Sequence, residues 1–154
     1  MFASQNDGAM KKFRRTPWRF QQTFVTPLKE LGAFTAAIVG SIPDVAAATV
    51  VVDQVVFPAK TLDALLSQRQ LSLPLLRDAS ITAETAEEVQ PLLIAAFSDW
   101  VDFLFTPSPK PFVIYADHDE YATLFASSRS HLNSVATALV DGGFKSVENY
   151  TRKV

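Results

Sequence analysis

The sequence predicts an α+β protein that folds as a single domain. The chain has 154 residues, 48% of them hydrophobic, which is enough for a sizeable core. Apolar residues recur at helical spacing in much of the first two thirds, and strand-like alternation follows a proline-rich connection at 106–111. We therefore expect N-terminal helices and one buried strand, a long amphipathic helix, and a C-terminal ββαβ unit. Residues 1–10 are expected to be a flexible segment, and 11–154 the domain.

A helix is expected over residues 17–40. Over 17–40, apolar residues recur at intervals of three, four and seven, which favours a helix that breaks near Pro27. These positions are Phe20, Phe24, Leu28, Leu31 and Ile38. A strand over 18–25 is the competing interpretation, because large side chains also alternate there.

A buried strand and a short helix are expected next. Residues 48–57 are apolar and rich in β-branched side chains apart from Asp53 and Gln54, which predicts a buried strand. A helix is expected at 61–70, where leucines share one face, and irregular chain at 71–80 around Pro74.

The strongest helical pattern covers 82–105. Thr85 and Glu88 have the spacing of a capping box, and Pro91 is expected to bend the helix or mark its beginning. The apolar positions are Val89, Leu92, Leu93, Ala96, Phe97, Trp100, Val101 and Leu104. Three prolines at 107–111 then predict an extended linker.

The C-terminal third shows the ββαβ pattern. The expected elements are strands at 112–116 and 121–126, a helix at 130–141, and a last strand at 144–152. Ser128 or Ser130 is suited to cap the helix, and Gly142–Gly143 to end it. The two strands are expected to form a hairpin with its tip at 117–120.

Composition and hydropathy indicate a soluble, cytoplasmic protein. The absence of cysteine excludes disulfides, thiol nucleophiles, thiolate zinc sites and iron–sulfur clusters. The N-terminus lacks the basic-then-apolar order of a signal peptide. The most apolar stretch, 31–52, carries Pro43 and Asp44 near its centre, which argues against a membrane span. No motif predicts a cofactor.

Charge is unevenly distributed along the chain. Residues 1–30 carry six cations and two acids, whereas the other 124 residues carry eight cations and fourteen acids. The basic residues lie among the aromatic side chains of Phe13, Trp18 and Phe20, a pattern that could track phosphates and stack on bases, or bind an anionic membrane surface. The candidate nucleic-acid residues are Lys11, Lys12, Arg14, Arg15, Trp18 and Arg19. The alternative is a helix start whose aromatic side chains enter the core.

An acidic stretch between 78 and 120 offers a second candidate surface. It contains nine carboxylates and one cation, Lys110. Asp99 and Asp102 are three residues apart and flank Trp100, so a helix would place the two carboxylates on one face. Such a face could dock a basic partner, with Trp100 or Tyr121 as an interface anchor. The alternative is a solvated helix face.

The tip at 117–120 is the one concentration of residue types common in catalytic and metal sites. Asp117, His118, Asp119 and Glu120 could bind a divalent cation or perform acid–base chemistry. Adjacent strand residues point to opposite faces, so further ligands would have to come from elsewhere. Asp and His are also ordinary turn residues.

We therefore expect a non-catalytic protein-binding module, of accessory, adaptor or inhibitor type, that acts through charged surface patches. A small metal-dependent enzyme with its site at 117–120 is the first alternative, and nucleic-acid binding through 11–20 is the second. An enzymatic role is thus left open but not favoured. The high apolar content suits a homodimer or a stable complex with another protein.

Overall fold

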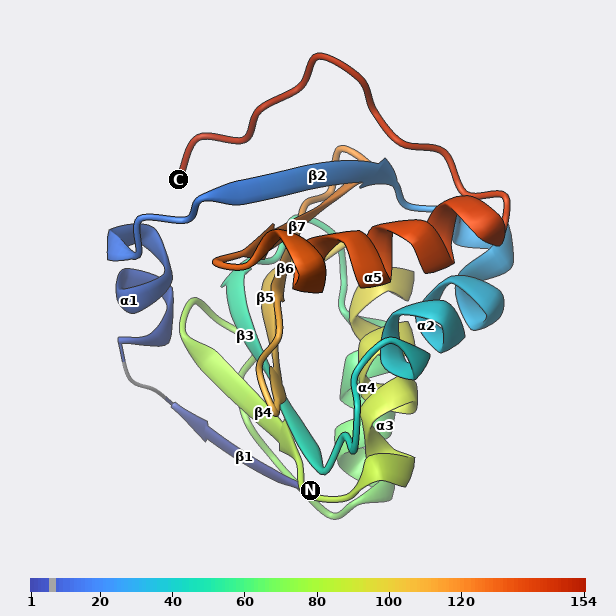
Figure 1. Ribbon diagram of the computed structural model, residues 1–154. Helices are drawn as coiled ribbons and strands as arrows, with labels where there is room; N and C mark the ends of the chain where they lie inside the picture. The colour runs from blue at the N-terminus through green and yellow to red at the C-terminus, as the bar shows by residue number, and fades with distance from the viewer. Residues whose placement is uncertain (6–7) are drawn as a thin grey trace.

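The computed structural model describes residues 1–5 and 8–154, which form one α+β domain (Figure 1). Seven strands in these residues form one antiparallel sheet in the order β1-β4-β3-β5-β6-β7-β2. The strands are β1 (Phe2–Gln5), β2 (Phe20–Val25), β3 (Ala47–Gln54), β4 (Ala79–Ala83), β5 (Asp102–Ser108), β6 (Val113–Ala116) and β7 (Tyr121–Ala126). The α-helices are α1 (Ala9–Arg15), α2 (Leu31–Gly40), α3 (Lys60–Gln68), α4 (Ala86–Ser98) and α5 (Arg129–Asp141), and a 3-10 turn, η1 (Leu28–Glu30), precedes α2.

The two faces of the sheet are covered unequally. Helices α2 to α5 lie on one face, and α1 lies on the other, here called the α1 face (Figure 1). The alternation of β3 explains both layers, because Val50 and Val52 enter the large core with the four helices, whereas Val51 points to the α1 face. There Met10 and Phe13 of α1 cover a second, smaller apolar cluster. No helix in the described part of the chain combines the length and hydropathy that a membrane span requires.

The N-terminal prediction is partly wrong. Residues 20–25, predicted as helix, form β2 and pair with β7, which confirms the competing strand interpretation. Phe24 is fully buried on the core side of this strand, so alternation rather than helical spacing places it there. Residues 2–5 of the segment predicted as flexible form β1 against β4, and residues 6 and 7 lie outside the described residues. Helix α1, with Phe13 in the smaller apolar cluster, agrees with the alternative of a helix start whose aromatic side chains enter the core.

The long helix predicted over 82–105 is two elements. Helix α4 ends at Ser98, the chain turns at Trp100 with a φ of 55°, and β5 follows. Strand β5 lies between β3 and β6, which draws Phe103 and Phe105 into the large core. Helix α4 begins after Thr85, but the predicted capping box does not form. The Thr85 side chain makes no cap hydrogen bond, and Glu88 accepts from the Glu84 backbone N–H at 3.0 Å.

Two further predictions are corrected next to this helix. Residues 79–83, predicted as irregular chain and helix start, form β4 between β1 and β3. Residues 106–108, predicted as linker, continue β5 along β3. Strand β6 pairs only with Phe103–Phe105, so Pro107 lies where β5 has a single neighbour and a missing N–H is tolerated.

The C-terminal third follows the prediction until its last element. Strands β6 and β7 form the predicted hairpin, and Ser128 caps α5 by accepting from the His131 N–H. Residues 144–152, predicted as a strand, make only a bridge between Ser146 and Phe24, flanked by backbone hydrogen bonds to Thr23 and Val25. Backbone pairing with β2 stops there, since Asn149 has a φ of 57°, which a continuous strand does not accommodate.

Candidate functional site

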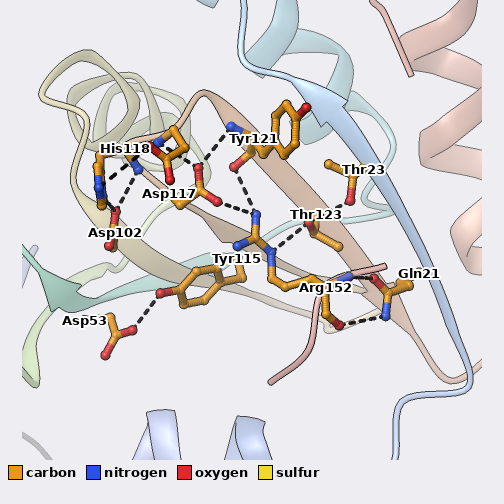
Figure 2. Close-up of polar contacts among 11 residues, drawn as sticks. Gln21, Thr23, Asp53, Asp102, Tyr115, Asp117, His118, Tyr121, Thr123 and Arg152 are labelled. Atoms are coloured by element: carbon orange, nitrogen blue, oxygen red, sulfur yellow. Dashed lines mark hydrogen bonds and ion pairs between the residues drawn. The ribbon is translucent and has the colours of Figure 1, made fainter. Parts of the chain in front are cut away.

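The α1 face has an apolar half and a polar half. The apolar half lies beneath α1. There the Phe13 ring stacks on the Tyr115 ring, with 5.8 Å between ring centres, and packs edge-on against the Phe125 ring, with 5.2 Å between ring centres. The polar half extends over the neighbouring parts of β3, β6 and β7 (Figure 2). Its residues include Asp53, Tyr115, Asp117, Thr123 and Arg152. These side chains are buried or half-buried, so their polar groups need hydrogen-bond partners, and they find them in one another.

Asp53 joins α1 to the sheet. Its carboxylate is 9% exposed and accepts hydrogen bonds from the Tyr115 hydroxyl at 2.6 Å and from Arg14 at 2.8 Å. Arg77, in the loop before β4, donates a third at 3.2 Å. One buried carboxylate thus holds together α1, β6 and a loop that are far apart in sequence.

These contacts keep the Asp53 carboxylate charged and the Tyr115 hydroxyl protonated. Burial raises the pKa of Asp53, but hydrogen bonds from Tyr115, Arg14 and Arg77 outweigh it and hold the pKa below its ordinary value. Burial, followed by the hydrogen bond to Asp53, raises the pKa of Tyr115 well above its ordinary value. Tyr115 therefore acts as a fixed donor to Asp53 rather than as a base.

A concave cationic surface adjoins this carboxylate. Four cations line a hollow of about 520 Å³ between α1 and the loop before β4, together with one carboxylate, Asp78. We call it the cationic hollow, and its cations are Lys11, Arg14, Arg15 and Arg77. The three from α1 share one helical face by their spacing, while Met10 and Phe13 pack on the sheet. Asp53 holds two of these four cationic groups in place, the guanidinium groups of Arg14 and Arg77.

The C-terminal segment closes the polar half. The Arg152 side chain is 10% exposed, pairs with Asp117 at 2.8 Å and donates to the Thr123 hydroxyl at 2.9 Å (Figure 2). Its guanidinium lies 4.9 Å from the centre of the Tyr115 ring. The Gln21 amide bonds both backbone groups of Arg152, at 2.8 and 3.2 Å. Arg152 therefore fastens the end of the chain to β2, β6 and β7.

The four polar residues of the hairpin tip do not converge. Asp117 accepts hydrogen bonds from the backbone N–H groups of Asp119 and Tyr121, as in an Asx turn, and also pairs with Arg152. His118 instead bonds the buried Asp102 through its Nδ1 and its backbone N–H, at 2.8 and 2.7 Å. Asp119 and Glu120 are exposed. Over residues 1–5 and 8–154, no three His, Cys, Asp or Glu side chains are grouped so that they could hold one metal ion.

The His118–Asp102 pair predicts a pH-dependent stability. The hydrogen bond from Asp102 raises the pKa of His118 above its ordinary value, burial opposes this, and nearby carboxylates reinforce it. A raised folded-state pKa stabilises the protein below about pH 6.5, and this contribution disappears as the pH rises through the folded-state pKa. Urea unfolding is expected to show a loss of stability between about pH 5.5 and about pH 8 that is smaller in His118→Gln. An equal loss in both proteins would contradict the pairing.

The two acidic residues of the predicted docking surface belong to different elements and are buried. Asp99 is 7% exposed and accepts from the backbone N–H groups of Thr61 and Leu62, where it caps α3. Asp102 is 5% exposed and begins β5, so the prediction that Asp99 and Asp102 share a helical face is wrong. Trp100 and Tyr121 are half-buried. The two carboxylates thus have internal partners rather than forming an open surface.

The basic-aromatic segment is divided between core and surface. Phe13 is 3% exposed, and the half-buried Trp18 donates its indole N–H to the Phe13 carbonyl at 3.1 Å. Phe20 lies under the guanidinium groups of Arg19 and Arg129. Apart from Pro17, the exposed residues of the segment are cations, among them Lys11, Lys12, Arg15 and Arg19. Phe13 is therefore not available for stacking on a base.

Sequence reasoning did not identify Asp53, Arg77, Tyr115 and Arg152 as site residues. The one local signal was Asp53, a carboxylate that interrupts an apolar strand pattern. Its partners lie 39, 24 and 62 residues away along the chain, so no spacing rule connects them.

Comparison with known proteins identifies no relative. No protein-family model, curated protein or solved structure matches this chain. The proposals below therefore depend on the residues themselves.

Proposed function

We propose that this protein is a non-catalytic binding module whose cationic hollow docks an acidic segment of another protein. The observation that carries the proposal is the gathering of Lys11, Arg14 and Arg15 with the distant Arg77 around one concavity. Arg77 is far from the other three cations in the sequence, and the fold brings it beside them.

The hollow is suited to carboxylates. Arg14 and Arg77 are held by Asp53 but remain 39% and 68% exposed, so each guanidinium keeps donors for an external acceptor. Because Asp53 restricts both side chains, less conformational freedom is lost when a partner binds. Opposite charge also accelerates encounter with an acidic partner. The proposal changes the expected partner from basic to acidic.

Protein is favoured over nucleic acid for two reasons. Phe13, an aromatic side chain of the basic segment that would stack on a base, is 3% exposed and lies in the smaller apolar cluster. Four cations around a concavity also do not form a long phosphate-tracking stripe.

Charge reversal tests the proposal. Lys11→Glu/Arg15→Glu changes two exposed cations that have no bonding partner among the described residues. We expect it to lower affinity for a short Glu-rich peptide by about tenfold or more, and to flatten the salt dependence. Fluorescence anisotropy of the labelled peptide measures both. Lys29→Glu/Lys60→Glu, with the same net charge change on exposed residues elsewhere, is expected to bind nearly as the unmodified protein does.

Three results would overturn the proposal. One is no detectable peptide binding by the unmodified protein. Another is an equal loss of affinity in both double variants, which would indicate a non-specific charge effect. The third is tighter binding of a single-stranded oligonucleotide of the same net charge, which would assign the hollow to nucleic acid instead.

A further inference from the structure

A groove lies along the flank of α1 that carries Lys12 and Thr16, on a different side of the helix from Lys11 and Arg15. It has a volume of about 260 Å³ and is lined by residues of α1, β3, β5 and the turn after β5. Its floor is apolar and consists of Val51, Leu104 and Val113. Small-molecule pockets begin at about this size.

The groove continues past Trp18. A second hollow, of about 330 Å³, shares Thr16, Trp18 and Lys110 with the first and extends to Ser128 at the start of α5. Trp18 and Lys110 therefore lie where the two hollows meet. The indole is held in place, since its N–H donates to the Phe13 carbonyl and its ring packs 6.0 Å from the Phe13 ring.

The polar groups of the groove are cationic or neutral. Lys12 and Lys110 are both exposed, and neither ammonium is paired with a carboxylate of the described residues. Thr49 and Thr106 face each other across β3 and β5 on the groove wall. The Thr106 hydroxyl has no protein hydrogen-bond partner within the described chain. The groove thus presents an aromatic and aliphatic interior with positive charge at its rim.

We propose that this groove binds a small aromatic carboxylate. The ring would lie over Leu104 and Val51 beside the half-buried indole of Trp18, where offset and edge-on contacts are favourable. The carboxylate would reach Lys110 and Lys12 at the rim, with Thr106 as a further donor. The two lysines supply the complementary charge, and the size of the groove limits the ligand to one or two rings. This site is independent of the cationic hollow.

Nuclear magnetic resonance on the full chain tests the site with naphthalene-2-carboxylate as the probe and naphthalene-2-carboxamide as its neutral counterpart. The chain has two tryptophans, Trp18 and Trp100, and only Trp18 lines the groove, so Trp100 is an internal control. We expect the carboxylate to shift the Trp18 indole N–H signal saturably, and the carboxamide to bind about tenfold more weakly.

A matched pair of variants locates the charge. Lys110→Gln is expected to weaken carboxylate binding about three- to tenfold without affecting the carboxamide, whereas Lys29→Gln leaves both unchanged. Both lysines are exposed, so neither variant threatens the fold. Equal affinity for the two probes, the same affinity in both variants, or no movement of the Trp18 signal would each overturn the proposal.

Discussion

Replacing Phe13 by Ala is expected to destabilise the protein by about 3–5 kcal/mol, the cost of truncating a buried phenyl ring. Phe13 is 3% exposed and contacts the rings of Trp18, Tyr115 and Phe125. It is also the main apolar anchor of α1, a helix of seven residues that is too short to be stable alone. The substitution should therefore release α1 from the sheet. Urea unfolding followed by tryptophan fluorescence measures the loss.

A matched control tests whether the loss of stability comes from the buried position of Phe13 rather than from the removal of any phenyl ring. Phe57 is 50% exposed, so Phe57→Ala is expected to change stability by about 0.5 kcal/mol or less. Because α1 carries both the cationic hollow and one flank of the groove, Phe13→Ala should also weaken both proposed binding activities. Unfolding of Phe13→Ala at the same urea concentration as the unmodified protein would contradict the role of Phe13 as an anchor.

Replacing Asp53 by Ala is expected to cost about 2–3 kcal/mol, the upper range for hydrogen bonds to a charged group. The variant leaves the half-buried Tyr115 hydroxyl without its acceptor and separates Arg14 and Arg77 from their shared partner. Partial exposure of both arginines reduces their share of the loss, since water can solvate them. Urea unfolding at neutral pH measures the difference.

Glu148→Ala is the control for removal of a carboxylate. Glu148 is exposed and has no bonding partner in the described part of the chain, so its substitution should change stability by about 0.5 kcal/mol or less. The same small effect from Asp53→Ala would mean that the carboxylate does not join α1 to the sheet. A larger effect accompanied by weaker binding of the acidic peptide would connect the Asp53 contacts to the order of the cationic hollow.

The elements that were predicted well from the sequence are those whose apolar residues follow a single periodicity, either that of a helix or that of a strand. Helices α3 and α5 and the β6–β7 hairpin have clear patterns and clear ends, such as the cap at Ser128. Strand β5 was assigned to the preceding helix because its apolar residues follow α4 without a glycine or proline between them. The turn between α4 and β5 has Trp100 in a left-handed backbone conformation, which no sequence pattern predicts.

The site was harder to predict than the fold because its contacts are long-range. The charges of Lys11, Arg14 and Arg15 are evident in the sequence, but Arg77 joins them only through the return of the chain to β4. The acidic residues at 99 and 102 illustrate the opposite error. They look like a surface pair in sequence, yet one caps α3 and the other bonds His118.

The backbone contacts of residues 145–147 have a consequence for self-association. They bond Thr23 and Val25 at the outer edge of β2, so half of this margin of the sheet is already paired with the chain's own backbone. At the other margin, β1 has β4 as its single neighbour in the described sheet. The β1 edge is thus the more open margin for edge-to-edge pairing. Two copies joined through their β1 edges would present only the partly paired β2 edges, which favours a closed two-fold dimer over a growing fibre.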